Sequence, residues 1–278
     1  MENAMYTVVI KVGGGEGIDP TALSNEIAEL VSSGIRVVLV HGGSHETNML
    51  AQALGHPTQT ITSPSGNQSR RTDEHTLDIF KMVYCGKVNK AVVQSLRQVG
   101  VDAIGLSGID AGIWMGTRKS AIRAVEDGRT RIIRDDLSGK VDTVDAEFLN
   151  MLLAAGRVPV LTPPAITPDG IAINVDADRA AAATAKALGA DELLLLSNVP
   201  GVLRDFADPD SLIETVTSET LAQANNAAKG RMKNKVLAAQ EAIAGGVHRV
   251  TIGSASGENP IQQARSGAGT TFIQEIPS

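Results

Sequence analysis

Two glycine-rich loops are the parts of the sequence best suited to chemistry. KVGGG spans residues 11–15 and HGGS spans residues 41–44. Each follows a short apolar run typical of a buried strand, so each places bare backbone amides at a strand's end. Amides in that position suit phosphate or carboxylate oxygens. Either loop could equally be a tight turn without a ligand, so the loops alone establish no function.

The second half of the chain adds charged candidates. NVDAD, at residues 174–178, precedes an alanine-rich segment, so its carboxylates can cap a helix or organise cations. KGRMKNK, at residues 229–235, opens another predicted helix with four cations. Because the amino end of a helix dipole is positive, an anionic ligand explains these cations better than helix stability does. A solvated basic face is the alternative.

Other reactive residue types carry weaker signals. Arg70 and Arg71 follow a Ser/Gly/Asn-rich loop, and an arginine fork suits a carboxylate. Cys85 lies on an apolar helical face, which favours core packing over a nucleophilic role, and as the single cysteine it cannot form an intramolecular disulfide. The five histidines show no metal-ligand spacing, so no protein metal cluster is expected.

Composition excludes several classes of protein. The 278 residues are 42% apolar and 20% charged, which is enough for a sizeable core, and the net charge of −6 gives no general reason to bind nucleic acid. No apolar run approaches the ~18 residues that span a bilayer. Without a basic, cleavable leader the expected location is cytoplasmic. P-loop and dinucleotide-binding glycine patterns are both missing, which disfavours a nicotinamide enzyme.

The elements that must position these residues alternate between strand and helix. A strand at 6–12, a helix at 20–33 and a strand at 35–40 form a βαβ unit, which implies a parallel sheet. Further strands are predicted at 157–161, 193–196 and 248–252, and further helices at 77–99, 146–155, 179–188 and 233–244. Since ligands of open parallel sheets bind at the carboxyl ends of strands, the glycine loops should share one edge.

Residues 113–144 break this alternation. They have no helical period, and turn signals at Asp127-Gly128 and near Ser138-Gly139 predict an antiparallel hairpin insert. The insert is basic within an acidic chain. It is either a solvated edge protected by charge or a docking surface for an acidic partner. Its candidate docking residues are Arg118, Lys119, Arg123, Arg129 and Arg131.

Eight motifs, in order along the chain, together resemble the amino acid kinase family, in its acetylglutamate kinase branch. They are KVGGG (11–15), HGGSHETN (41–48), RRTD (70–73), GKVNK (86–90), GLSGID (105–110), NVDAD (174–178), SNVPGV (197–202) and GRMKNKV (230–236). The resemblance implies ATP- and Mg²⁺-dependent phosphorylation of the side-chain carboxylate of an N-blocked amino acid. It also implies a three-layer αβα sandwich around a mainly parallel sheet, in a homodimer or larger homo-oligomer.

The resemblance also assigns roles to residues. Lys11 and Lys235 would flank the transferred phosphoryl group, and Asp178 would orient them. Amides of Gly14, Gly42 and Gly43 would donate to the ligands, those of Gly14 and Gly43 to phosphate. Gly42, Gly43, Arg70 and Asn174 would bind the amino-acid substrate in a lobe of residues 1–167, which ends in the proline-rich stretch 162–168. The nucleotide would lie in a second lobe, residues 168–278, against Ser197, Asn198, Val199, Gly201 and Val202.

Three strings depart from the acetylglutamate kinase pattern. QSRRTD replaces G-L-R-V-T-D at residues 68–73, LSNVPG replaces L-T-D-V-P-G at 196–201, and GRMKNK replaces G-G-M-x-P-K at 230–235. All three look like the [LysW]-aminoadipate kinase branch. Its substrate is 2-aminoadipate whose amine is linked to the C-terminal glutamate of a small acidic carrier, LysW. The alternatives are an N-acetylglutamate 5-kinase and a non-catalytic nucleotide or amino-acid sensor.

Overall fold

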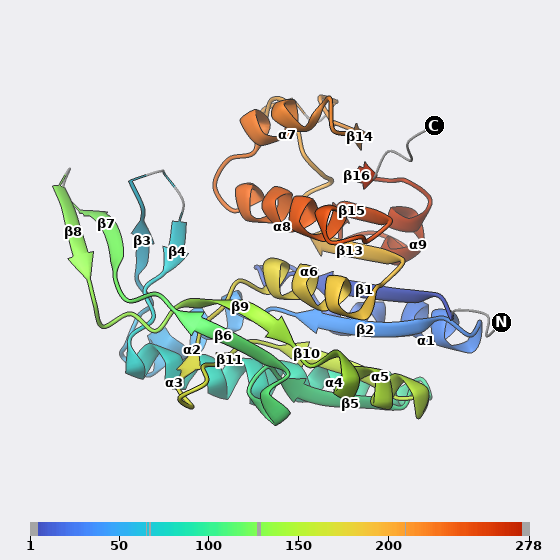
Figure 1. The fold of residues 1–278 in the computed structure, drawn as a ribbon, viewed down its shortest axis with the longest axis horizontal. Coiled ribbons are helices and arrows are strands. Elements are labelled where there is room, and N and C mark those ends of the chain that lie inside the picture. The colour runs from blue at the N-terminus through green and yellow to red at the C-terminus, as the bar shows by residue number, and fades with distance from the viewer. Residues whose placement is uncertain (1–4, 65, 67, 127–128, 209, 274–278) are drawn as a thin grey trace.

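The protein's central layer is one eight-stranded sheet (Figure 1), described here from a computed structural model that covers residues 5–64, 66, 68–126, 129–208 and 210–273. Its strands are β1 Thr7–Val12, β2 Arg36–His41, β5 Ala103–Ser107, β10 Val158–Thr162, β13 Glu192–Ser197, β14 Thr215–Val216, β15 Arg249–Ser254 and β16 Thr270–Ile273. The order is β14-β16-β15-β13-β1-β2-β10-β5. Pairing is parallel except between β15 and β16.

Helices cover both faces of this sheet and make the outer layers. One face carries α5 Ala146–Ala154, α6 Ala177–Leu188, α7 Leu221–Ala227 and α8 Met232–Ala244. The other carries α1 Ser24–Ser32, α2 Ser44–Ala53, α3 Glu74–Lys81, α4 Asn89–Gln98 and α9 Pro260–Arg265. The predicted three-layer sandwich around a mainly parallel sheet is therefore confirmed. None of the described helices is long and apolar enough to cross a membrane.

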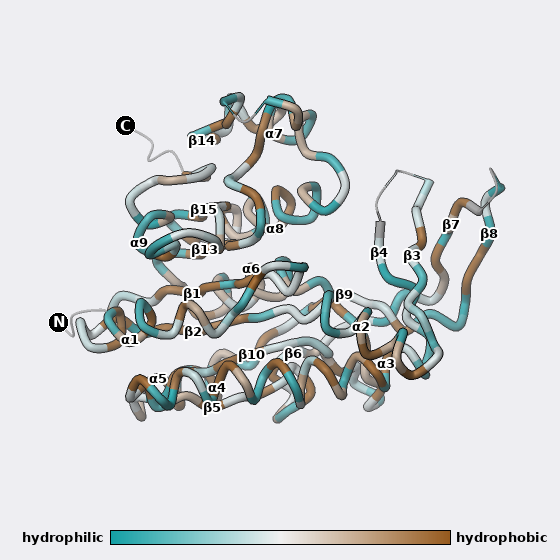
Figure 2. Tube along the Cα trace, turned by 180° about the vertical axis from the view of Figure 1, so that it is seen from behind, coloured by the Kyte–Doolittle hydropathy of each residue, from teal (hydrophilic) through white to brown (hydrophobic). Residues whose placement is uncertain are grey.

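The central strands supply two separate cores. Along β1, Val9 packs into one core and Ile10 into the other, and β13 alternates in the same way. Because both sheet faces are buried, these strands are continuous apolar runs, as Figure 2 shows for β1 and β13. That is why the sequence locates them to within about two residues.

One predicted helix is more complex than its periodicity indicates. The segment predicted as a single helix over 77–99 consists of α3, a π-helical stretch at Met82–Val88, and α4. The helix predicted over 20–33 likewise opens with a 3₁₀ turn, Pro20–Leu23, before α1. A π-helical stretch rotates the following side chains relative to an ideal helix, and such stretches often lie at functional sites.

The insert is antiparallel, as predicted. β6 Trp114–Arg118 pairs with β9 Gly139–Val144, and β7 Ile122–Glu126 pairs with β8 Arg129–Ile133. The predicted turn at Asp127-Gly128 lies outside the described residues. Near the second predicted turn, residues 134–137 connect β8 to β9; Ser138 itself bridges to Asn174, and Gly139 begins β9. Glycine is needed there because a Cβ would lie 2.5 Å from the Thr117 carbonyl oxygen.

Shorter strands complete the region around the insert. β11 Ala165–Ile166 and β12 Ala172–Ile173 join β6 and β9 in a four-stranded sheet, and β3 Thr60–Thr62 pairs with β4 Gln68–Arg70. Figure 1 shows the β3–β4 and β7–β8 hairpins side by side at one end of the molecule. The division into a substrate lobe, 1–167, and a nucleotide lobe, 168–278, stays a prediction.

Candidate active site

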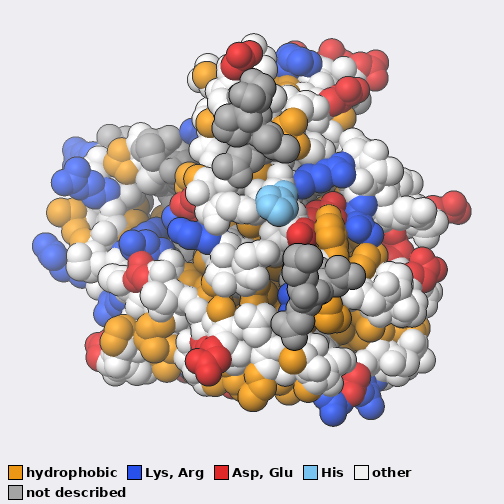
Figure 3. Space-filling view, turned by 45° about the vertical axis from the view of Figure 1, so that its right-hand side comes forward, with side chains coloured by type: hydrophobic (Ala, Val, Ile, Leu, Met, Phe, Trp, Pro, Cys, Tyr) orange, Lys and Arg blue, Asp and Glu red, His pale blue; other side chains and the backbone are white. Residues whose placement is uncertain are grey.

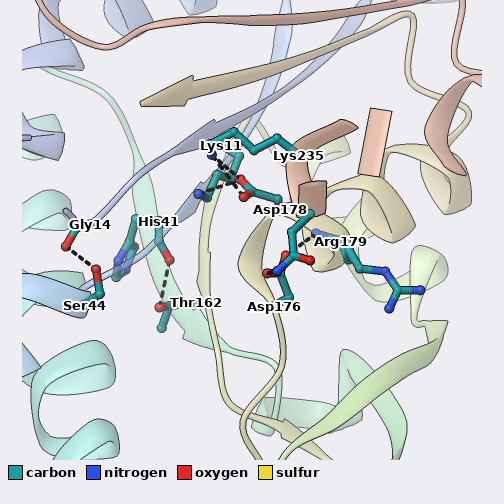
Figure 4. Close-up of polar contacts among 10 residues, drawn as sticks. Lys11, Gly14, His41, Ser44, Thr162, Asp176, Asp178, Arg179 and Lys235 are labelled. Carbon is teal, nitrogen blue, oxygen red and sulfur yellow. Dashed lines mark hydrogen bonds and ion pairs between the residues drawn. The ribbon is translucent and has the colours of Figure 1, made fainter. Parts of the chain in front are cut away.

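Two lysines from opposite ends of the chain meet on one buried carboxylate (Figure 4). Lys11 lies near the end of β1, Asp178 lies in the first turn of α6, and Lys235 lies in the first turn of α8. Lys11 Nζ is 2.6 Å from Asp178 Oδ1. Lys235 Nζ donates to both carboxylate oxygens at 3.0 Å. The three predicted catalytic residues therefore form one compact cluster, and each is at most 7% exposed.

The balance of burial and charge differs among the three groups. Burial alone would raise the pKa of Asp178, but the two lysines hold it well below its usual range. Burial alone would lower the pKa of Lys11, but Asp178 outweighs burial and the pKa is raised. The pKa of Lys235 is lowered, because burial dominates and Asp178 offsets it only in part. The cluster thus holds two positive charges and one negative charge, and its net positive charge can attract an anion.

A second set of polar contacts fixes α6 against α8. Asp176 caps α6, with Oδ1 accepting from the Arg179 amide at 3.0 Å and Oδ2 accepting from Asn234 Nδ2 at 2.9 Å. Arg179 Nε donates to Glu241 Oε2 at 2.9 Å. Since Asn234 precedes Lys235 and Asp176 is two residues from Asp178, these bonds set the register of the lysine–aspartate pair. Burial, followed by the nearby charge of Asp178, raises the pKa of Asp176.

The two glycine loops pack directly on each other. A Cβ on Gly14 would lie 2.1 Å from the Gly43 nitrogen, so only glycine permits the approach. The Gly14 carbonyl accepts from Ser44 Oγ at 2.8 Å and from the His45 amide at 2.7 Å. The amide of Gly42 donates to the Val12 carbonyl at 3.1 Å, so the predicted donation to a ligand would have to share or replace this bond. Gly42 still lines the cavity through its backbone.

Beneath these loops lies a buried histidine. His41 is fully buried, and burial lowers its pKa to about 4. The ring is therefore neutral at pH 7, with Nδ1 2.9 Å from the Gly42 carbonyl oxygen and Nε2 3.0 Å from Asn89 Nδ2. Since the amide nitrogen Nδ2 of Asn89 can only donate, Nε2 accepts and Nδ1–H donates to the carbonyl. Thr162 Oγ1 donates to the His41 carbonyl at 3.2 Å, so His41 supports the loop from within the core.

The predicted substrate residues lie at one end of the cavity. Arg70 Nη2 donates to the Ser44 carbonyl at 3.1 Å and to Asn48 Oδ1 at 2.7 Å. Asn174 Nδ2 donates to Thr72 Oγ1 at 2.9 Å. Both Arg70 and Asn174 line the cavity; Gly43 is not among the lining residues, because the ring of Tyr84 lies 3.1 Å from where its Cβ would be.

The predicted nucleotide residues follow β13. Ser197, Asn198, Val199 and Gly201 line the same cavity. The structure places Val202 in the core instead: it is fully buried and its amide donates to Thr270 Oγ1 at 2.8 Å. A nucleotide contact by the Val202 side chain therefore has no geometric basis.

One cavity of about 1110 Å³ extends from the predicted substrate residues to the predicted nucleotide residues. Its lining carries eight cationic and three carboxylate side chains, in contrast to the acidic chain as a whole. The cations are Lys11, Arg70, Lys119, Arg179, Arg204, Lys229, Arg231 and Lys235. Among the described residues no group of three or more His, Cys, Asp or Glu side chains could hold a metal ion. The cavity is thus suited to a polyanion beside a second anionic molecule.

The basic hairpin residues divide into two groups. Arg118 donates to the carbonyls of Asp136 and Arg134, each at 2.9 Å, and Lys119 lines the cavity. Arg123 on β7 and Arg129 and Arg131 on β8 are exposed. Lys and Arg side chains gather at the left of Figure 3, the end where Figure 1 places β7 and β8.

The sequence analysis did not identify the residues that hold the two glycine loops and Arg70 in place. Tyr84 is buried within the π-helical stretch, stacked on Phe80 with ring centroids 3.7 Å apart, and it lines the cavity. Ser44 and Asn48 anchor Gly14 and Arg70 through the bonds given above. Ser44 and Asn48 belong to the HGGSHETN string, which was the available signal, whereas Tyr84 carried none.

A cationic cavity at the carboxyl ends of a parallel sheet, with two lysines on one carboxylate, defines a phosphoryl-transfer class of α/β enzyme. The chain belongs to the amino acid kinase family, whose model matches residues 6–254, and it is a phosphotransferase. Use of ATP follows from that membership.

Several relatives are similar in sequence to this chain over nearly its whole length. It is 52% identical over 263 residues to a [LysW]-aminoadipate kinase of Deinococcus radiodurans, covering 95% of this chain and 90% of that protein. It is 48% identical to a [LysW]-aminoadipate kinase of Thermus thermophilus, covering 95% and 98%. An acetylglutamate kinase of Myxococcus xanthus is 35% identical, covering 97% and 89%.

Solved structures share the fold. An N-acetylglutamate synthase from Neisseria gonorrhoeae, in complex with coenzyme A and N-acetyl-glutamate, aligns with a TM-score of 0.78 and 26% identity. The alignment covers 98% of this chain, which spans about three fifths of that structure (60%). A carbamate kinase from Giardia lamblia bound to AMP-PNP aligns with a TM-score of 0.68 and 19% identity, over 98% and 99% of the two chains, and shows the fold alone.

Proposed function

We propose that this enzyme transfers the γ-phosphoryl group of ATP to the side-chain carboxylate of 2-aminoadipate whose amine is blocked by an acidic carrier protein. The observation that carries the phosphoryl transfer is the Lys11–Asp178–Lys235 cluster in the wall of the cavity. The acceptor is supported by the two relatives at 52% and 48% identity, both named [LysW]-aminoadipate kinase. N-acetylglutamate is the alternative acceptor, supported by the relative at 35%.

The chemistry required of the protein is mainly electrostatic. A carboxylate with a pKa of about 4.3 is already ionised at neutral pH, so no general base is needed. The obstacle is the approach of one anion to another, which positioned cations overcome. Lys11 and Lys235 supply two such charges, and Asp178 fixes their positions. The amide of Gly14, which lines the cavity, is suited to hold a phosphate oxygen, whereas phosphate binding by Gly43 stays a prediction from the family resemblance.

Magnesium fits this arrangement only through the nucleotide. Both oxygens of Asp178 already accept from lysines, and the described part of the chain offers no three-residue metal cluster. When bound with the nucleotide, Mg²⁺ would neutralise part of the phosphate charge. Besides Asp178, the carboxylates that line the cavity are Glu16 and Asp176, and Asp176 already accepts from the Arg179 amide and from Asn234.

The basic insert gives the carrier a docking surface in this proposal. Arg123, Arg129 and Arg131 would attract an acidic protein, and Lys119, in the same insert as Arg118, lines the cavity. Within the described residues, Arg118 is held by two backbone carbonyls, which favours a fixed base for the hairpin. A homodimer or larger assembly and the two-lobe division remain part of the proposal.

The test is an ATPase-coupled assay with three acceptors: N-acetylglutamate, N-acetyl-2-aminoadipate and carrier-linked 2-aminoadipate. We expect the highest kcat/KM with the carrier-linked acceptor. Lys235→Ala in the same assay should lower kcat at least ~100-fold, the order seen when a transition-state donor is removed. A preference for N-acetylglutamate would support the arginine-route alternative, and ATP binding without turnover of any acceptor would support a sensor. A near-normal rate for Lys235→Ala would contradict the assigned site.

A further inference from the structure

The cations at the start of α8 are the part of the cavity that the lysine–aspartate cluster leaves unexplained. Lys229 and Arg231 line the cavity, whereas Lys233 does not. Neither Lys229 nor Arg231 forms an ion pair with any of the described residues. Arg231 is the N-cap of α8 and lies four residues before Lys235, so the two face the same side of the helix.

Arg70 presents a second guanidinium to the same space. Its Nη2 is held by Ser44 and Asn48, but Nη1 is buried and has no hydrogen-bond partner in the described part of the chain. Burial lowers the pKa of Arg70, and the charge of Arg231 lowers it further. The same charge acts on Tyr84, whose pKa burial raises. Arg231 therefore lies within electrostatic range of the predicted substrate end of the cavity.

Arg70 and Arg231 line one cavity, and neither forms an ion pair among the described residues, so their like charges repel each other unless an anion binds there. Position 231 is also where this sequence has arginine and the acetylglutamate kinase pattern G-G-M-x-P-K has glycine. The extra guanidinium therefore coincides with one of the strings that separate this chain from enzymes acting on an acetylated acceptor.

The chemistry of the acceptor indicates which anion is present. An acetyl-blocked amino acid has one carboxylate besides the one that is phosphorylated, and Arg70 is sufficient to bind it. A glutamate-blocked acceptor has a further carboxylate, because glutamate has two carboxyl groups and only one can form the amide. Such an acceptor requires a second site, and arginine binds carboxylates through two parallel hydrogen bonds.

Building on the proposed function, we propose that Arg231 binds the free carboxylate of the glutamate that blocks the acceptor's amine. Arg231 is then a specificity-determining residue, and it favours glutamate-blocked over acetyl-blocked acceptors even without the rest of the carrier. Arg70 binds the carboxylate next to the blocked amine, so the two guanidinium groups hold two different carboxylates of one acceptor in the same cavity.

Two synthetic acceptors of equal length isolate this carboxylate. One is N-acetyl-γ-glutamyl-2-aminoadipate, and the other is N-acetyl-4-aminobutanoyl-2-aminoadipate, which lacks only the free carboxylate of the glutamyl group. The measured quantity is the ratio of their kcat/KM values. For the unaltered enzyme we expect about 10 to 100 in favour of the glutamyl probe, the range of a hydrogen-bonded charge pair.

In Arg231→Ala this ratio should fall to about one, and Arg231→Lys should restore part of it. Lys233→Ala is the matched control, since it removes a cation from the same helical turn outside the cavity, and it should keep the full ratio. A ratio near one in the unaltered enzyme would overturn the proposal. So would an unchanged ratio in Arg231→Ala, including the case in which kcat falls equally for both probes because Arg231 acts on phosphate.

If the proposed function is wrong, the assays give a result that differs from a failure of the Arg231 proposal. If no aminoadipate acceptor is phosphorylated but N-acetylglutamate is, the proposed acceptor is wrong. The same pair of blocking groups on glutamate then measures the ratio, and the outcomes for Arg231 are read in the same way. Thermal unfolding of each variant checks that the comparison is made between folded proteins.

Discussion

The buried cluster and the basic hairpin both concentrate positive charge in an acidic protein, but they do so by opposite means. Lys11 and Lys235 are almost wholly buried and share Asp178, whereas Arg123 and Arg129 stand exposed on β7 and β8. Charges in a low-dielectric site are strong and must be compensated, while exposed charges are weakened by water and salt. The cluster is therefore suited to act on reacting atoms, and the hairpin to steer a partner.

The largest effect should come from removing the charge that compensates the cluster. Asp178→Ala removes the carboxylate that pairs directly with two buried lysines, so we expect kcat to fall on the order of 1000-fold and stability by about 3–5 kcal/mol. Initial rates and urea unfolding measure the two losses. Asp142→Ala is the exposed counterpart, since Asp142 pairs with Lys140 on β9 at 2.9 Å, and it should change stability by at most about 1 kcal/mol.

The loss of stability in Asp178→Ala should depend on pH in one direction. The pKa of Asp178 is lower in the folded than in the unfolded protein, so its stabilising effect is present above about pH 4 and is lost as pH falls through the folded-state value. The unfolding free energies of the unaltered protein and of Asp178→Ala should therefore converge as the pH falls below about 4. A difference in unfolding free energy that stays constant from pH 7 to pH 3 would contradict a role for the charge.

His41 extends the comparison to a buried ionisable group whose ring, among the described residues, contacts the Gly42 carbonyl and Asn89 instead of a carboxylate. Because burial lowers its pKa from 6.5 to about 4, the unfolded chain binds a proton that the folded protein does not, and stability is lost as pH falls below about 6.5. We expect this one residue to remove about 2 kcal/mol of unfolding free energy between pH 7 and pH 5.

His41→Gln should flatten that part of the pH profile, measured by urea unfolding at half-unit steps. His248→Gln is the matched control, because the His248 side chain is 77% exposed, and it should leave the profile unchanged. An equal slope in the unaltered protein and in His41→Gln would show that the neutral buried ring is not the cause.

The sequence predicted the sheet and the cluster for different reasons. Strands such as β1 and β13 are buried on both faces, so their apolar runs are long enough to locate them. Lys11 and Lys235 are 224 positions apart, and no local pattern joins them; their pairing came from the family resemblance. Periodicity alone would have left two unrelated lysines.

The details that escaped prediction depend on three-dimensional register. Whether the amide of Gly42 faces a ligand or the Val12 carbonyl is decided by how β2 aligns with β1. The π-helical stretch at Met82–Val88 keeps the apolar spacing of an ordinary helix, so the placement of Tyr84 against Gly43 has no signature in the sequence. Val202 is one residue beyond the cavity-lining Gly201, and only the backbone path shows that it enters the core.

The smallest expected effect tests the exposed half of the comparison. Reversing two hairpin charges, Arg123→Glu with Arg129→Glu, should lower kcat/KM for the carrier-linked acceptor about tenfold relative to N-acetyl-2-aminoadipate, chiefly through association. The relative loss should shrink as salt rises from 0.05 to 0.5 M, because the screening length falls below ~10 Å. Lys186→Glu, an exposed reversal near the end of α6, should show neither effect. An equal loss in the double variant and in Lys186→Glu would mean that net charge, rather than this hairpin, steers the carrier. A loss that persists in high salt would indicate a packed contact instead of steering.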